Sequence, residues 1–112
     1  MSINKKYIDI LSKVTSKAAL SSSYFVGKKN KKIADKAAVD SMRTELNKIE
    51  MNGVVVIGEG ELDKAPMLYI GEKLGTKVGP DFDIAVDPLE GTNFAANNLP
   101  GALSVIAIAE KG

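Results

Sequence analysis

The sequence contains neither cysteine nor histidine, and these two absences exclude a large part of enzyme chemistry. Without cysteine the chain has no disulfide, no thiolate metal site and no cysteine nucleophile. Without histidine it lacks the most common general base and the usual ligand of zinc and of redox metals. Any metal bound here must therefore be held by oxygen atoms, which favours Mg²⁺ or Mn²⁺.

Neither sign of charge is in excess, because 15 Lys and Arg residues oppose 14 Asp and Glu residues. No global basic field points to nucleic acid, and the lysine-rich run at 28–32 is a local exception. No apolar run reaches membrane-spanning length, and the N-terminus lacks the continuous apolar segment of a signal peptide. We therefore expect a cytoplasmic protein with no nucleic-acid partner and no membrane partner.

The first half of the chain carries helical patterns. Apolar residues at three- and four-residue spacing predict a helix from about Asn4 to Ser22 and a second from about Ala34 to Glu50. The lysine-rich run lies between them in a predicted loop. With 112 residues the chain is at most one domain, and its 45% hydrophobic content is that of an ordinary globular protein.

The second half carries strand patterns. Residues 54–57 and 82–87 are predicted strands, and residues 102–109 are apolar at nearly every position, which predicts a strand buried on both faces. Residues 65–72 fit either a short strand or a helical turn, and residues 93–97 fit a short helix. The expected fold class is α/β, an α+β layered sandwich in which two N-terminal helices precede a mixed sheet. We expect the sheet to be incomplete, because a strand buried on both faces needs further neighbours.

The most informative stretch follows the second predicted strand and reads Asp87-Pro88-Leu89-Glu90-Gly91-Thr92-Asn93. We expect Pro88 to fix a turn that brings Glu90 back toward Asp87 at the end of the strand. Gly91 permits a close approach to the backbone, and the amides that follow point outward if a helix begins there. Carboxylates beside such amides suit a hard cation bound to a phosphate. Taken alone, the stretch would favour an ordinary turn.

A second acidic cluster follows the strand predicted at 54–57. Glu59, Glu61 and Asp63 would share one face of an extended segment, where like charges repel unless a cation lies between them. Surface loops are often acidic, so this cluster is weak evidence by itself. Two acidic clusters, each at the end of an apolar strand, together predict half of a metal-assisted phosphatase site.

Three segments resemble a known family: Ile-Gly-Glu-Gly-Glu at 57–61, Ala-Pro-Met-Leu-Tyr-Ile-Gly-Glu-Lys at 65–73, and Asp-Ile-Ala-Val-Asp-Pro-Leu-Glu-Gly-Thr at 83–92. They are similar to class II fructose-1,6-bisphosphatases, a bacterial type within the lithium-sensitive sugar and inositol phosphatase superfamily. The resemblance covers the whole chain but only about the first third of a family member. It implies that residues 1–112 are the N-terminal part of a single catalytic domain.

The resemblance also implies roles for individual residues. It implies metal carboxylates at four positions, namely Asp35, Glu59, Asp87 and Glu90, with a backbone carbonyl from Leu89. It implies contacts to the substrate phosphate at Glu90, Gly91 and Thr92. Thr92 would orient the attacking water and donate to Asp35, and Lys31 would meet a phosphate as a point charge. The structural alternatives are a helix N-cap for Asp35 and a solvated loop for the lysines.

The implied reaction is hydrolysis of the 1-phosphate of fructose 1,6-bisphosphate to fructose 6-phosphate and phosphate in gluconeogenesis. It implies Mg²⁺ or Mn²⁺ as cofactor, a sugar bisphosphate as partner, inhibition by lithium, and a homo-oligomer at full length. Two alternatives stay open. One is a related phosphatase that acts on sedoheptulose 1,7-bisphosphate or an inositol phosphate, and the other is a non-catalytic module that binds a metal or an anion. Residues 1–112 alone are expected to be inactive.

Overall fold

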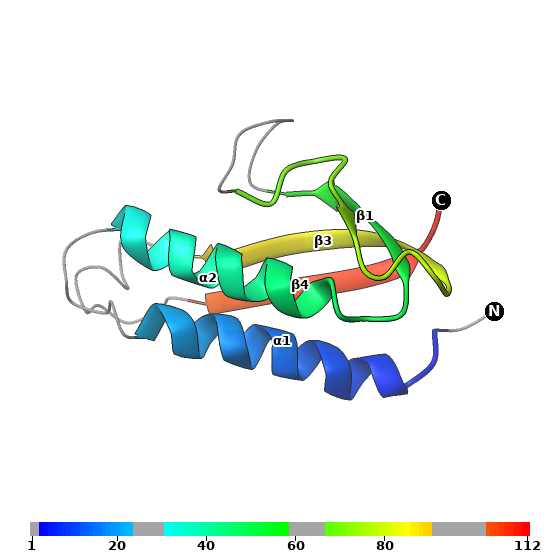
Figure 1. Cartoon of the computed structure of the whole chain (residues 1–112), viewed down its shortest axis with the longest axis horizontal. Helices are drawn as coiled ribbons and strands as arrows, with labels where there is room; N and C mark the ends of the chain where they lie inside the picture. The colour runs from blue at the N-terminus through cyan, green and yellow to red at the C-terminus, as the bar shows by residue number, and fades with distance from the viewer. Residues whose placement is uncertain (1–2, 24–30, 59–66, 91–102) are drawn as a thin grey trace.

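A computed structural model describes residues 3–23, 31–58, 67–90 and 103–112, without the side chains of residues 31, 32, 89, 90 and 103. Two helices precede four strands along the chain (Figure 1). The elements are α1 (Lys6–Ser23), α2 (Lys31–Leu46), β1 (Asn52–Ile57), β2 (Lys73–Leu74), β3 (Asp81–Glu90) and β4 (Leu103–Glu110). None of the helices within these ranges has the length and apolar character needed to cross a membrane.

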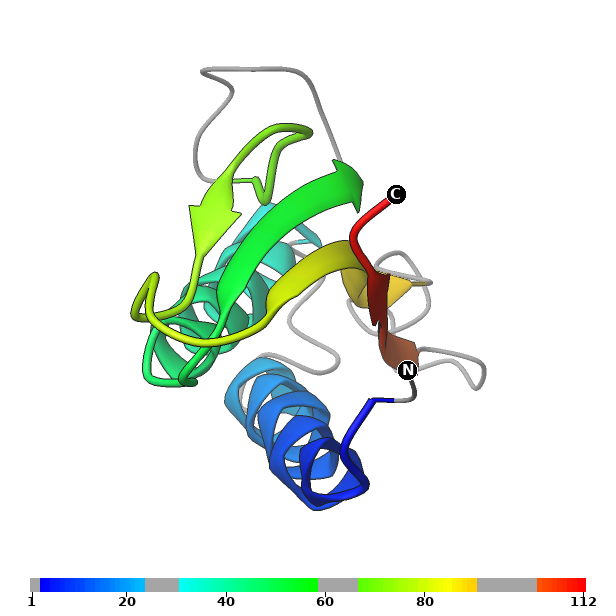
Figure 2. The same ribbon diagram turned by 90° about the vertical axis from the view of Figure 1, so that its right-hand side faces the viewer.

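The strands form one mixed sheet in the order β2-β1-β3-β4. The two central strands, β1 and β3, run parallel, whereas β2 and β4 pair antiparallel at the edges. Both helices cover the same face of this sheet and pack against each other (Figure 2). Helix α2 packs on β3, and α1 packs on β3 and β4. The predicted α/β class, with two helices followed by a mixed sheet, is confirmed.

Helix α1 begins where a side chain can cap it. The Asn4 Oδ1 atom accepts a hydrogen bond from the Lys6 amide at 2.9 Å, and the Asn4 carbonyl accepts one from the Tyr7 amide at 3.1 Å. Its end at Ser23 lies within one residue of the predicted end.

Helix α2 differs from the prediction at both ends. It begins at Lys31, three residues earlier than predicted, so Lys31 is the first helical residue and not part of a loop. It ends at Leu46, and the chain then tightens into turns in which the Lys48 amide donates to the Glu45 carbonyl at 3.2 Å. The apolar pattern continued through this turn because Ile49 is also buried.

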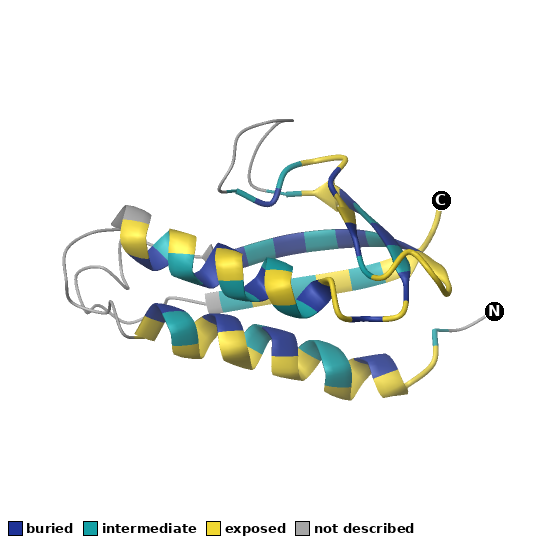
Figure 3. Cartoon of the chain, in the orientation of Figure 1, coloured by how far each residue is buried: buried dark blue, intermediate teal, exposed yellow. Residues whose placement is uncertain are grey.

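The core lies between the helices and the sheet face that they cover (Figure 3). On α2 the buried stripe includes Val39, Met42 and Leu46, which belong to the same hydrophobic cluster as the inward residues of the sheet such as Ile84. At the other end of the layer, the Tyr7 ring meets the Phe82 ring edge-on at a centroid distance of 5.0 Å. Because the core is built from two layers, each strand buries only one of its faces.

Strand β4 shows the consequence, and here the prediction was wrong. Its residues alternate between half-buried and exposed, and Val105 retains 42% of its exposure. The predicted burial on both faces would need a second layer, and no described element covers the face opposite the helices. This face carries apolar residues, such as Ile57 of β1, 64% exposed, and Ala85 of β3, together with the acidic residues Asp83 and Asp87 of β3.

Strand β3 also differs from the prediction, since it continues through the proline to Glu90. Pro88 was expected to start a turn, but it is buried within the strand. The sheet accommodates it through an irregular register: Asp87 lies opposite Val105 and Glu90 lies opposite Leu103. Three steps along β3 therefore match two steps along β4, which is the geometry of a β-bulge.

The remaining predicted elements have mixed outcomes. Over residues 67–72 the ambiguous segment forms a turn that leads into the short strand β2. The short helix predicted at 93–97 lies outside the described residues.

Candidate metal and phosphate site

The predicted site residues are distributed over two described elements and two stretches that lie outside the description. Asp35 lies on α2, Lys31 begins that helix, and Asp87 and Glu90 lie on β3. Glu59, Gly91 and Thr92 lie outside the described residues. The positions of Asp35 and Asp87 are therefore the structural basis on which the site can be discussed.

The parallel pairing of β1 with β3 brings the end of β1 beside the part of β3 that leads to Asp87. Ile57, at the end of β1, pairs with Ala85 of β3. Asp87 follows two residues later on β3, and Glu59 follows two residues after Ile57 in the sequence. Parallel neighbours end at the same edge, which is where open α/β sheets usually bind ligands.

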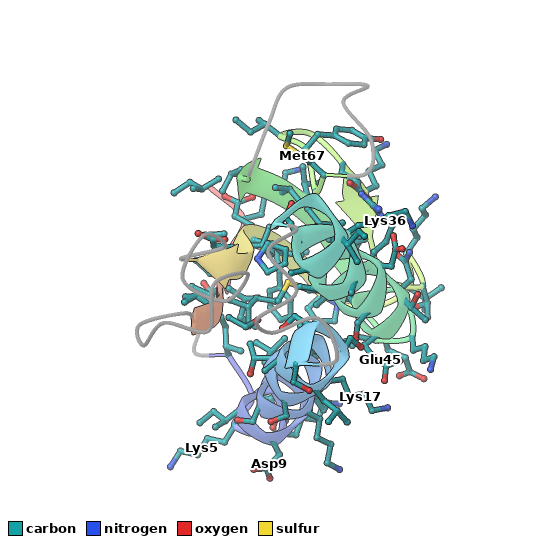
Figure 4. The ribbon with its side chains drawn as sticks, turned by 90° about the vertical axis from the view of Figure 1, so that its left-hand side faces the viewer. Lys5, Asp9, Lys17, Lys36, Glu45 and Met67 are labelled. Atoms are coloured by element: carbon teal, nitrogen blue, oxygen red, sulfur yellow. The ribbon has the colours of Figure 1, made fainter. Side chains whose placement is uncertain are left out.

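The first turn of α2 lies at this same end. In Figure 1 the beginning of α2 and the tip of β3 are both on the left, and in Figure 4 the molecule is seen from that side. Lys31 and Lys32 in the first turn add positive charge to a helix end that is already positive through its dipole.

Asp35 is the fifth residue of α2 and therefore cannot be its N-cap. It lies four residues before Val39, so it continues the buried stripe of Val39, Met42 and Leu46 by one more turn toward the helix start. Asp35 is only half-buried. Ala34, one residue before it, is fully buried, so Asp35 lies at the margin of the apolar stripe.

The β-bulge on β3 affects the two acids of the second motif. In a regular strand, residues three apart alternate to opposite faces. Because positions 87 and 90 pair with β4 positions only two apart, the bulge keeps these two positions in phase along the sheet. Pro88 was expected to bring Glu90 back toward Asp87 through a turn. The bulge relates these two positions instead, while the chain stays within the strand.

The described residues alone do not form a metal centre. No group of three or more acidic side chains lies close enough together among them to hold an ion. Asp87 alternates with the buried residues Val86 and Pro88 and so belongs to the face away from the helices, whereas Asp35 comes from the helix layer. The two carboxylates share an end of the sheet and not a face. Their chemistry, oxygen only, fits Mg²⁺ or Mn²⁺.

An ion pair that was not predicted from the sequence joins α2 to the sheet. The Arg43 guanidinium binds the Glu72 carboxylate through two bonds, Nε to Oε2 at 2.7 Å and Nη2 to Oε1 at 3.0 Å. The same Nη2 donates to the Met67 carbonyl at 2.7 Å. Glu72 keeps only 9% of its side-chain exposure and Arg43 keeps 26%. The hydrogen bond to Glu72 raises the pKa of Arg43 above its ordinary value.

Gly58, which directly follows β1, makes a close backbone contact near the candidate site. A Cβ atom at this position would lie 2.5 Å from the Leu68 carbonyl oxygen and 2.9 Å from Val55 Cγ1. The backbone at the end of β1 therefore packs directly on the backbone of residues 68–70, and only glycine fits. The sequence placed glycines on both sides of Glu59, but it gave no indication of this contact.

Comparisons with known proteins agree with the motifs. The family model described as bacterial fructose-1,6-bisphosphatase, glpX-encoded, matches residues 5–112. The chain is 48% identical over 110 residues to the D-fructose 1,6-bisphosphatase class 2/sedoheptulose 1,7-bisphosphatase of Prochlorococcus marinus (strain MIT 9303), a match that covers 98% of this chain and 33% of that protein. A protein of the same name from Thermosynechococcus vestitus is 50% identical, and the match covers 88% of this chain and 32% of that protein. The chain thus spans about a third of the length of these curated relatives.

Among solved structures, the fold is similar to that of an extragenic suppressor from Pyrococcus furiosus. The TM-score is 0.62 at 17% sequence identity, and the match covers 95% of this chain and 41% of that chain. At this identity the likeness concerns the fold alone.

Proposed function

The chain belongs to the family of bacterial, glpX-encoded fructose-1,6-bisphosphatases, and we propose that it supplies the metal- and phosphate-binding part of such an enzyme. The reaction is hydrolysis of the 1-phosphate of fructose 1,6-bisphosphate to fructose 6-phosphate and phosphate. We assign residues 1–112 to the N-terminal part of a single catalytic domain, because the relatives are about three times as long. The enzyme belongs with the lithium-sensitive phosphatases and works in the cytoplasm as a homo-oligomer.

The observation that carries this proposal is the parallel register of β1 and β3. It brings the end of β1, two residues before Glu59, beside the part of β3 that leads to Asp87. A phosphate monoester resists attack because ester and nucleophile are both anionic. A bound Mg²⁺ or Mn²⁺ would neutralise the phosphoryl oxygens and stabilise the leaving alkoxide. The residues proposed to hold it are the four carboxylates, Asp35, Glu59, Asp87 and Glu90, with the Leu89 carbonyl.

The remaining residues act on the substrate and on the attacking water. Thr92 accepts a hydrogen bond from the water and donates one to Asp35, which holds the hydroxyl in a single orientation. Glu90, Gly91 and Thr92 contact the phosphate, and Lys31 adds a positive charge at the start of α2. These roles require the first turn of α2 and the last residues of β3 to lie at the same end of the molecule, and Figure 1 supports this arrangement.

A second substrate has a specific observation in its favour. The printed names of the relatives include sedoheptulose 1,7-bisphosphatase as well as fructose 1,6-bisphosphatase. Both substrates present a phosphate on the first carbon of a ketose. We propose that the full-length enzyme accepts both sugars, since the metal- and phosphate-binding residues meet the part that they share.

Release of phosphate by the full-length enzyme tests the proposal. Activity with fructose 1,6-bisphosphate should disappear with EDTA and return with Mn²⁺ or Mg²⁺. Asp35→Asn and Asp87→Asn should each lower kcat by about 10²-fold or more, as expected for loss of a group that stabilises the transition state. Asp40→Asn is the matched control, because Asp40 lies on the same helix but is exposed and pairs with Lys36. Full turnover after exhaustive treatment with EDTA would contradict the proposal.

A further inference from the structure

The ion pair between Arg43 and Glu72 occupies a distinctive place among the charges of the described residues. The other pairs lie in the helix layer: Lys17 with Glu45 between α1 and α2, Lys36 with Asp40 within α2, and Lys48 with Glu45 at its end. They are also more exposed, since their lysines keep 57% to 67% of their side-chain exposure. Of these four ion pairs, Arg43 with Glu72 joins the helix layer to the sheet.

The sheet side of this pair is rigidly attached to β1. The Val55 amide donates to the Glu72 carbonyl at 2.9 Å, and the Gly71 amide donates to the Val55 carbonyl at 2.8 Å. The Glu72 carboxylate also accepts a bond from the Tyr69 amide at 3.3 Å. Val55 pairs with Ile84 of β3, which lies three residues before Asp87. Glu72 is therefore connected through two ladders of backbone bonds to the strand that carries Asp87.

On the helix side, Arg43 is connected to Asp35 through α2 itself. Arg43 and Asp35 lie on α2 eight residues apart, which corresponds to about 12 Å along one rigid helix. Helix α2 also packs through buried apolar residues such as Val39 and Met42, and apolar contacts have no strong directional preference. A planar guanidinium that binds a carboxylate through two bonds and a carbonyl through a third fixes orientation as well as distance.

We propose that Arg43 is a positioning residue for the metal carboxylates: through Glu72 it fixes α2, which carries Asp35, against the β1–β3 pair, which carries Asp87. This role rests on the proposed function, because it presumes that both aspartates bind the metal. It goes beyond that function in assigning a task to two residues that do not touch the metal. Partners that orient metal ligands in this way typically change metal affinity or activity by about 10- to 100-fold when they are replaced.

The test is a Mn²⁺ titration of the full-length enzyme and its Arg43→Lys variant. Lysine keeps the positive charge but cannot form the two-bond fork and the bond to Met67 together. We expect the Mn²⁺ concentration for half-maximal hydrolysis of fructose 1,6-bisphosphate to rise about 10-fold or more. Free Mn²⁺ measured by electron paramagnetic resonance, without substrate, should show a matching loss of affinity. Lys17→Met removes an ion pair from the helix layer and should leave both readouts unchanged.

A second variant separates positioning from stability. Arg43→Met combined with Glu72→Met removes both charges together, and such apolar replacements of buried pairs often fold as well as the original. We expect this double variant to keep its thermal midpoint and still to bind Mn²⁺ about 10-fold or more weakly. Wild-type Mn²⁺ affinity in Arg43→Lys or in the folded double variant would overturn the positioning role alone. A wild-type enzyme that needs no metal would overturn the proposed function and the positioning role together.

Discussion

Replacing Gly58 by alanine should destabilise the protein through a backbone clash at the end of β1. The added Cβ atom would lie 2.5 Å from the Leu68 carbonyl oxygen, about 0.9 Å closer than an ordinary contact of 3.4 Å. This oxygen belongs to the backbone and cannot rotate away, and the second neighbour, Val55, is fully buried. Overpacking of this kind typically costs about 1–3 kcal/mol. At about 2 kcal/mol, the thermal midpoint of a domain of this size would fall by about 10 °C.

The clash should also leave a local signature. To relieve it, residues 68–72 must move away from β1, which lengthens the bonds between the Gly71 amide and the Val55 carbonyl and between the Val55 amide and the Glu72 carbonyl. We therefore expect both amides to exchange with deuterium faster in Gly58→Ala than in the wild type. Urea denaturation followed by circular dichroism gives the change in unfolding free energy.

Gly71→Asn is the matched control for this experiment. Gly71 has a φ of +93°, and no atom lies within 4 Å of a Cβ built there. Because asparagine tolerates positive φ better than most residues, this change should cost less than about 1 kcal/mol. If Gly58→Ala were as stable as Gly71→Asn, with unchanged exchange at both amides, the close backbone contact at the end of β1 would be refuted.

Three further predictions concern pH, catalysis and association. Hydrogen bonds from Lys17 and Lys48 lower the pKa of Glu45. The ionised Glu45 carboxylate therefore contributes to stability above its unfolded pKa near 4.5, and this contribution is lost as pH falls through the lower pKa of the folded state. Glu45→Gln should flatten this fall of the unfolding free energy at acid pH, measured by urea denaturation. In the full-length enzyme, Thr92→Ala should lower kcat by about 10²-fold with little change in KM, and Thr92→Ser should recover much of the rate. The alternative to a catalytic role is that Thr92 only caps a helix, and an Ala variant that melts earlier but keeps a normal kcat would favour that alternative. Val105→Thr should reduce self-association of residues 1–112 in sedimentation experiments, since Val105 is an exposed apolar residue on the sheet face that no described element covers.

The sequence by itself determined the types of the elements and the kind of ligand atom that these residues can offer a metal. Helix and strand periodicities are local properties of short stretches of consecutive residues, so both helices and the predicted strands at 54–57 and 82–87 could be recognised without a structure. The absence of cysteine and histidine limits the side-chain ligands that residues 1–112 can offer a metal ion to oxygen atoms, whatever the fold. The motif around Asp87 identified the family, because its residues are contiguous. The start of α2 was missed because the lysine-rich run has no apolar periodicity.

The tertiary structure decided which of these elements meet. Parallel pairing of β1 with β3 and the bulge that keeps positions 87 and 90 in phase depend on which strands become neighbours, and periodicity carries no information about neighbours. The pair of Arg43 and Glu72 spans 29 residues of sequence, so no local pattern marks it. The burial of β4 depends on which layers cover it. An apolar run predicts that a strand will be covered, but the packing of the helices on one face of the sheet determines which side of the strand is buried.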